Sequence, residues 1–221
     1  MTTPNHLLFI HIPKTGGQSI VSTFGLYDQF TPRNHGKAYD FKNDKSVCFG
    51  HADIKTLLEK KVLSYEFYNE SFKFCIVRNP YERIVSLFHY LASHQRFQVP
   101  YTFTTFLILF LFKNFIKYLY MNRNLIPKSS DTNVVNVGDI NSQWNQMVSW
   151  IPDDIDKIFR FENFADISDE IKQLSQNNCN KKMIHKNLSS HRPYQEYYDG
   201  EVRKLIEDLY QDDFERFNYS F

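Results

Sequence analysis

A short stretch near the amino terminus combines residue types that suit the binding of an anion. Lys14, Thr15 and Ser19 offer an amine and two hydroxyls, and the pair Gly16-Gly17 stands between them. Glycines let backbone N–H groups approach a phosphate closely, and lysine adds a full positive charge. In a Walker A loop the lysine follows the glycines, so this is a different pattern. We predict an anion-binding loop; the alternative is a plain strand–turn–helix connection with an incidental lysine.

The flanking residues predict how this loop is held. The apolar run Leu7–Ile12 is typical of a buried strand in a parallel sheet, and it ends at Pro13. Ile20, Val21 and Phe24 then follow at helical spacing. A strand, a glycine turn and a helix start direct backbone N–H groups and the positive end of a helix dipole at one place.

Two further strand-like runs end in side chains with chemical potential. His51 follows residues 46–50, and Arg78 follows residues 72–77. In open α/β sheets, ligands bind at the carboxyl ends of the strands, so we expect both residues near Lys14. For His51 the alternative is a surface or structural histidine.

Arg78 also precedes a helix with a strong start signal. Asn79 suits the N-cap, Pro80 suits the first helical position, and Glu82 suits a capping box. Ser86 lies off the apolar stripe of this helix. We expect Arg78 and Ser86 to converge on one anion, because arginine presents a planar fork of donors. The alternative for Arg78 is a salt bridge to a neighbouring carboxylate.

The rest of the pattern predicts an α/β fold with a parallel sheet flanked by helices, in one domain over residues 1–221. A fourth strand is expected over 155–162. Helices are expected from Asp53 to Val62 and over 103–119, 141–150, 164–175 and 197–214, and loops over 27–45 and 122–139. The apolar 103–119 segment is too short to span a bilayer. We expect a buried helix there; the alternative is contact with a membrane surface or a partner.

Composition excludes some classes of function. The 26 basic and 25 acidic residues argue against a nucleic-acid partner held by net charge. The cysteines, which are Cys48, Cys75 and Cys179, cannot form a disulfide framework. Together with a polar amino terminus, they predict a cytoplasmic protein. Neither a carboxylate cluster nor Cys/His spacing suggests a metal site. The basic stretch 181–193 is either a lid over the anion site or a solvated face.

Two motifs together resemble a known family. The stretches Phe9–Ile20 and Ile76–Ser86 resemble the sulfotransferases that use the donor PAPS (3′-phosphoadenosine 5′-phosphosulfate). The resemblance is to the carbohydrate branch, which includes heparan sulfate 2-O-sulfotransferase and small bacterial relatives. Phe159–Asn163 and the stretch from His185 to Phe214 resemble later family blocks, so the resemblance covers most of the chain. It implies a fold similar to that of P-loop NTPases.

The resemblance also implies roles for individual residues. Lys14 would stabilise the leaving group and His51 would act as the base, with a pKa near the unshifted value of about 6.5. Gln18 stands where threonine is commoner, but it can still donate a hydrogen bond. The nucleotide would be bound by the loop at its 5′-phosphosulfate, by an arginine and a serine at its 3′-phosphate, and by a covering loop: Lys14, Thr15, Gly16, Gly17, Gln18, Ser19; Arg78, Ser86; Asn187, Ser189, Arg192.

The expected activity is in-line transfer of a sulfuryl group from PAPS to a hydroxyl of a carbohydrate acceptor, with PAP as the product and no metal. Such a transfer needs positioning and stabilisation of spreading negative charge. One alternative is a phosphotransferase on the same fold, which would need a Mg²⁺-binding acid near the loop. Another is a non-catalytic module that binds partners through the 103–119 helix and the nucleotide pocket.

Overall fold

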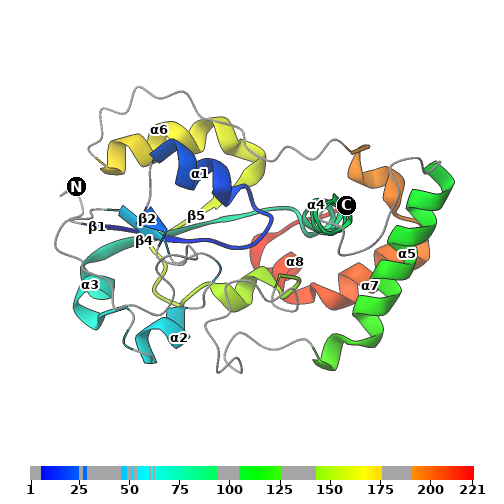
Figure 1. The fold of residues 1–221 in the computed structure, drawn as a ribbon, viewed down its shortest axis with the longest axis horizontal. Coiled ribbons are helices and arrows are strands. Elements are labelled where there is room, and N and C mark those ends of the chain that lie inside the picture. Colours follow the sequence, from blue (N-terminus) through cyan, green and yellow to red (C-terminus); the bar gives the residue numbers. More distant parts are fainter. Residues whose placement is uncertain are drawn as a thin grey trace.

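The computed structural model describes residues 6–24, 27–28, 46–48, 51, 54–59, 61, 63–93, 105–125, 143–175 and 191–221. Its centre is a parallel sheet in the order β2-β3-β1-β4-β5 (Figure 1). The strands are β1 (His6–Ile10), β2 (Tyr27–Asp28), β3 (Ser46–Cys48), β4 (Ser71–Val77) and β5 (Lys157–Arg160). The predicted α/β class with a parallel sheet is therefore confirmed. The short strand β2 was not predicted, because its residues fall in a polar stretch expected to be a loop.

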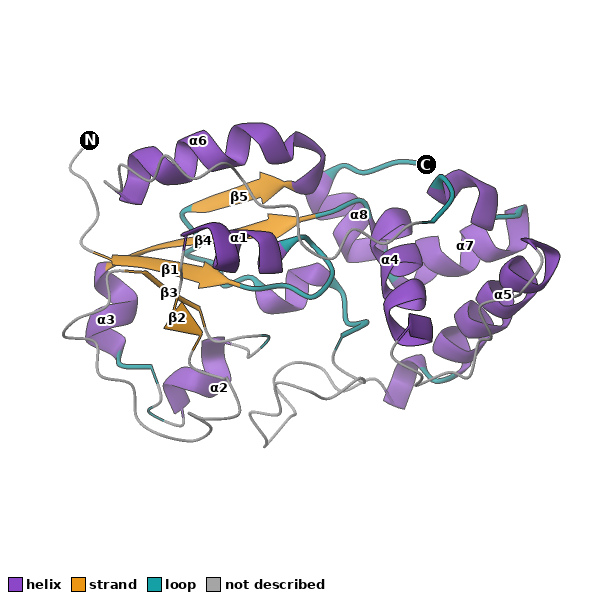
Figure 2. Cartoon of the chain, turned by 45° about the horizontal axis from the view of Figure 1, so that its top comes forward, coloured by secondary structure: helices purple, strands orange, loops and turns teal. Residues whose placement is uncertain are grey.

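Helices cover both faces of this sheet (Figures 1 and 2). The α-helices are α1 (Gly17–Phe24), α2 (Ile54–Glu59), α3 (Tyr65–Glu70), α4 (Pro80–Ser93), α5 (Thr105–Met121), α6 (Phe164–Ser175), α7 (Gly200–Leu209) and α8 (Gln211–Phe217). Short 3₁₀ turns are η1 (Arg123–Leu125), η4 (Met147–Trp150), η5 (Phe161–Asn163) and η6 (Tyr194–Tyr197). Helices α1 and α6 lie on one face and α2 and α3 on the other, while α4, α5 and α7 lie beyond the carboxyl ends of the strands.

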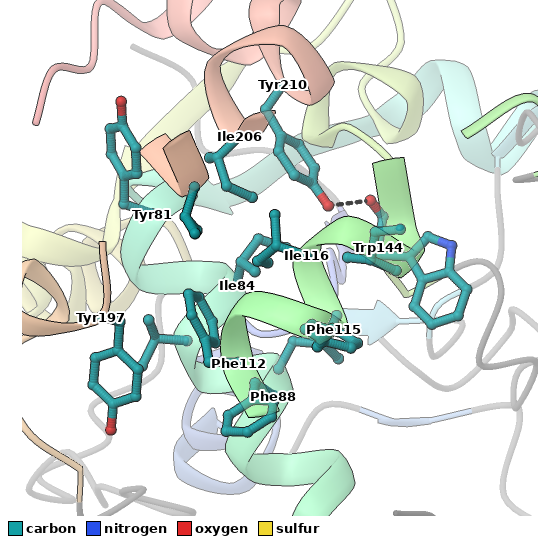
Figure 3. Packing of buried hydrophobic residues seen from close by; sticks show 14 of the residues in the cluster. Tyr81, Ile84, Phe88, Phe112, Phe115, Ile116, Trp144, Tyr197, Ile206 and Tyr210 are labelled. Carbon is teal, nitrogen blue, oxygen red and sulfur yellow. Dashed lines mark hydrogen bonds between the residues drawn. The ribbon is translucent and has the colours of Figure 1, made fainter. Parts of the chain in front are cut away.

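The packing around β1 explains why its residues 7–10 are all apolar. Successive side chains of a strand point to opposite faces, and both faces of β1 are covered. Leu8 and Ile10 pack in one core cluster with Leu57 of α2. Leu7 and Phe9 pack in another cluster, with helices α1 and α6. A third cluster joins α4, α5 and α7 beyond the sheet (Figure 3).

The prediction of a helix over 141–150 is wrong. Its described part consists of turns over 143–146 and the 3₁₀ turn η4. Two buried side chains take the backbone groups that a helix would use. Arg83 donates to the carbonyls of Gln143 and Asn145, and the Asp213 carboxylate accepts the N–H groups of Met147 and Val148.

The helix predicted over 197–214 is divided in two. Helix α7 ends before Tyr210, whose backbone leaves the helical region (φ −121°, ψ 28°), and α8 begins at the next residue. The Tyr210 hydroxyl donates to the Trp144 carbonyl at 2.7 Å (Figure 3). The break thus coincides with a tertiary hydrogen bond that the amphipathic pattern does not reveal.

Helix α5 is only partly buried, so the expectation of a buried helix is half right. One face packs in the third core cluster through Phe112, Phe115 and Ile116. The opposite face exposes Phe106 by 79% and Met121 by 80%. None of the helices in the described ranges is both long enough and apolar enough to cross a membrane.

Asp213 holds the backbone of this part of the fold through two buried hydrogen bonds. It is fully buried, and its two oxygens accept N–H groups at 2.8 and 2.9 Å. Substitution Asp213→Ala leaves both donors without an acceptor, so we expect the free energy of unfolding to fall by about 2–4 kcal/mol in urea titrations. The matched control is Asp212→Ala at the exposed neighbouring position, which should change stability by less than about 0.5 kcal/mol. Equal effects of the two substitutions would contradict this account.

Candidate active site

The predicted loop joins β1 to α1 in a tight turn at the carboxyl edge of the sheet. Two of its residues have left-handed backbone conformations, with φ of 66° at Lys14 and 86° at Gly16. The Thr15 hydroxyl donates to the Ile12 carbonyl at 2.9 Å, and the Ser19 amide donates to the Gly16 carbonyl at 3.0 Å. The predicted order of strand, glycine turn and helix is confirmed.

The two glycines are required for different reasons. At Gly16 the positive φ favours glycine, and an added Cβ would lie 2.7 Å from a ring carbon of Phe161. At Gly17 an added Cβ would lie 2.1 Å from His11 Cδ2 and 2.3 Å from His11 Nε2. His11 is buried and stacks on Phe9, so it has little room to move. The start of α1 is therefore held against the imidazole of His11.

Lys14 is held in a partly buried position above an aromatic ring. Its Nζ lies 4.1 Å from the centre of the Tyr90 ring on α4. Burial, with a smaller contribution from the positive charge of Arg78, lowers the pKa of Lys14 to about 8. The amine is still charged at pH 7, but it is poorly solvated. An anion bound beside it would therefore be stabilised more than at a surface lysine.

His51 lies at the same edge of the sheet as the loop. Its Nδ1 is 2.8 Å from the carbonyl oxygen of His11, and the two imidazole rings are 4.3 Å apart. Because a carbonyl only accepts, Nδ1 carries the proton and Nε2 keeps its lone pair in the neutral ring. Burial lowers the pKa of His51 to about 4, aided by the charges of Lys14 and Arg83 and opposed by the hydrogen bond to His11. The expectation of an unshifted pKa is therefore wrong.

Arg78 contacts the loop directly. Its Nη1 donates to the Lys14 carbonyl at 3.3 Å, and the ring centre of Phe161 lies 4.2 Å from its Cζ. Its Nη2 lies 2.9 Å from Glu82 Oε1, so the salt bridge considered as the alternative is also present. Its Nε is buried and has no hydrogen-bond partner among the described residues. The guanidinium is therefore near the loop and retains an unused donor.

The helix start after Arg78 differs from the prediction in one respect. Asn79 caps the helix as expected, because its Oδ1 accepts the Tyr81 N–H at 3.1 Å. Glu82 does not close a capping box, since its carboxylate pairs with Arg78. The Asn79 N–H donates instead to Glu162 Oε1 at 2.7 Å. A residue from η5 thus replaces the local partner.

Ser86 is buried on the face of α4 that meets the loop. It lies between Arg83, which donates to the Pro13 carbonyl, and Tyr90, which contacts Lys14. Positions three, four and seven apart share one face of a helix. The structure therefore places Ser86 on the same face as these two loop contacts.

Arg83 is the functional-site residue that sequence reasoning missed. It is fully buried, and its guanidinium donates to three carbonyls at 2.9–3.0 Å: those of Pro13, Gln143 and Asn145. One of these carbonyls belongs to the start of the anion loop. The available signal was its place inside the second family motif, Ile76–Ser86, three residues before Ser86.

Four predicted residues remain, and their outcomes differ. Asn187 and Ser189 lie outside the described residues. Arg192 is described, and its guanidinium bonds Glu196 at 2.9 Å and the Thr105 hydroxyl at 2.8 Å, at the start of α5. Gln18 is exposed. Within the ranges that the structure describes, no group of three or more His, Cys, Asp or Glu side chains could hold a metal ion.

A parallel sheet whose first strand leads through a glycine loop into a helix is typical of α/β proteins that bind an anion at that turn. Comparison with family models makes the class specific, because the model described as the sulfotransferase family matches residues 1–220. The protein belongs to the sulfotransferase family, whose members transfer sulfuryl groups. No curated protein matches the sequence of this chain. Among solved structures, it is similar to mouse sulfotransferase SULT7A1 complexed with PAP, with 13% identity, a TM-score of 0.46, and coverage of 95% of this chain and 84% of that chain.

The close contact between Gly17 and His11 can be tested by adding one methyl group. Substitution Gly17→Ala should lower the free energy of unfolding by about 1–3 kcal/mol, because the Cβ overlaps the buried imidazole. The control is Gly200→Ala at the start of α7, where an added Cβ meets nothing within 4 Å. Thermal unfolding of both variants provides the measurement. Equal midpoints would show that His11 does not pack against this position.

Proposed function

We propose that the protein transfers a sulfuryl group from PAPS to a hydroxyl of a carbohydrate acceptor. The observation that carries this proposal is that Lys14, His51 and Arg78 gather around the loop between β1 and α1. Membership of the sulfotransferase family gives this arrangement its chemistry. The carbohydrate acceptor is supported by the resemblance of the sequence to the carbohydrate branch of the family.

In this proposal the loop binds the 5′-phosphosulfate of the donor. The residues Lys14 to Ser19 supply backbone N–H groups and one charged amine around the turn. Charge accumulates on the phosphate oxygen as the S–O bond breaks. The poorly solvated amine of Lys14 stabilises that charge more strongly than a solvated amine would.

Arg78 and Ser86 bind the 3′-phosphate in the same proposal. Arg78 lies against the loop and keeps Nε free of partners among the described residues. Ser86 is buried and shares one face of α4 with Arg83 and Tyr90, which both contact the loop. The two ends of the nucleotide are then held by adjacent parts of one sheet edge, so the donor is fixed in orientation before transfer.

His51 accepts the proton of the acceptor hydroxyl. The hydrogen bond to the His11 carbonyl assigns the proton of the neutral ring to Nδ1, which leaves the lone pair on Nε2. As the acceptor oxygen bonds to sulfur, its proton passes to Nε2 and PAP leaves. Because burial lowers its pKa to about 4, the imidazole is neutral and ready to accept at pH 7.

The transfer itself is tested with labelled PAPS and a panel of oligosaccharides. We expect the wild-type protein to label at least one glycan, and Lys14→Ala to lower that rate by at least about a hundredfold, because one stabiliser of the developing charge is lost. The control Lys204→Ala removes an exposed lysine of α7 and should leave the rate unchanged. Unchanged turnover in Lys14→Ala would remove Lys14 from the mechanism.

The pH dependence of kcat/KM tests both assigned groups. His51 accepts protons only above its pKa of about 4, and Lys14 is charged only below its pKa of about 8. We therefore expect kcat/KM to be flat between pH 5.5 and 7 and to fall as the pH rises through about 8. Lys14→Arg should remove the alkaline fall, since arginine keeps its charge.

His51→Ala should lower the rate by about 10²–10⁴-fold, because the group that accepts the proton is lost. A fall in the wild-type kcat/KM as the pH is lowered through about 6.5 would contradict the assignment of His51.

A further inference from the structure

We propose that Phe161 is a positioning residue that joins the two ends of the donor site by packing one ring against both Arg78 and the anion loop. This inference rests on the proposed function, because it assigns Arg78 to the 3′-phosphate. Phe161 lies in the stretch Phe159–Asn163, to which the sequence analysis assigned no role at the site.

The register of the sheet brings Phe161 beside Arg78. Strands β4 and β5 are parallel neighbours, and their last paired residues are Val77 and Arg160. The next residue on each strand is therefore Arg78 on one side and Phe161 on the other. The centre of the Phe161 ring lies 4.2 Å from the guanidinium carbon of Arg78.

The same ring also contacts the loop. A Cβ added at Gly16 would lie 2.7 and 2.8 Å from two carbons of the Phe161 ring. The ring therefore rests on the backbone of the loop at its second left-handed residue. A shift of the Phe161 ring would therefore change its contacts with both the loop and Arg78.

A hydrogen bond of the following residue fixes this turn in place. Glu162 Oε1 accepts the Asn79 N–H at 2.7 Å, and Glu162 Oε2 accepts the Tyr219 hydroxyl at 2.9 Å. Asn79 is the residue after Arg78. The turn η5 is thus bound to the end of β4 through two successive residues, of which one stacks on a side chain and one bonds the backbone.

The stacking arrangement is compatible with anion binding. A guanidinium carries its N–H donors in its plane, so a ring on its face does not block them, and Nε has no partner among the described residues. The ring restricts the rotation of a long side chain and favours the charged form electrostatically. Arg78 is then held in a fixed orientation, and less rotamer entropy is lost when a phosphate binds.

The test compares the affinities for PAP and for 5′-AMP, which differ only in the 3′-phosphate, by titration calorimetry. We expect Phe161→Met, which keeps apolar volume but has no ring face, to reduce the preference for PAP by about tenfold. Phe161→Tyr keeps the ring and should keep the preference. If the Met variant does not fold, Phe161→Leu takes its place.

Two controls separate positioning from packing. Phe164→Leu alters the neighbouring buried ring, 5.4 Å away, which also faces Gly16; it should leave the ratio of the two affinities unchanged. Arg78→Ala should abolish the preference for PAP, and adding Phe161→Met to it should reduce the preference no further. A Phe161→Met variant that retains the wild-type ratio, or that loses both affinities equally, would overturn the role of Phe161.

The binding of PAP and 5′-AMP to the wild-type protein tests the proposed function separately. If it binds neither nucleotide, the proposal of PAPS as donor fails. If it binds PAP and 5′-AMP equally, Arg78 does not serve the 3′-phosphate, and the role of Phe161 fails with that assignment. If it prefers PAP through Arg78, the result for the Phe161 variants decides the inference alone.

Discussion

The buried guanidinium of Arg83 is the interaction on which the arrangement of the site depends. Its three hydrogen bonds to carbonyls join the start of the anion loop to the segment that replaces the expected helix over 141–150. A buried charge without such partners would be strongly destabilising. Asp213 lies within electrostatic range and orders the adjoining backbone through the N–H groups of Met147 and Val148. The contacts of Arg83 and Asp213 thus hold helix α4, the loop and helix α8 in fixed positions relative to one another.

The site gathers positive charge that is incompletely neutralised. Lys14 contacts a tyrosine ring, Arg83 donates only to carbonyls, and Arg78 has one carboxylate partner, Glu82. Burial lowers the pKa of His51 most, and the charges of Lys14 and Arg83 lower it further. Such an environment favours a multiply charged anion, because the anion supplies the compensation that the described protein groups do not. The electrostatics therefore agree with the chemistry of the sulfotransferase family.

Local signals in the sequence were sufficient for the strand ends and for the loop. The strand-like runs predicted β1, β3, β4 and β5, and His51 and Arg78 were correctly expected to share one edge of a parallel sheet with Lys14. This succeeded because the carboxyl ends of parallel strands coincide whatever the order of the strands. The Asn79 cap was also predicted, since capping is a local interaction. The capping box was not, because Glu82 has a stronger, charged partner in Arg78.

The sequence by itself determined the class of fold, the anion loop and the placement of Lys14, His51 and Arg78 near one another, because these depend on periodicity and on short-range patterns. Only the tertiary structure decided the partners of Arg83, the division of α7 from α8, the lowered pKa of His51 and the position of Phe161 beside Arg78. Each of these arises from groups that are distant in sequence, whose contacts and desolvation depend on how the layers pack. A local pattern carries no information on that packing.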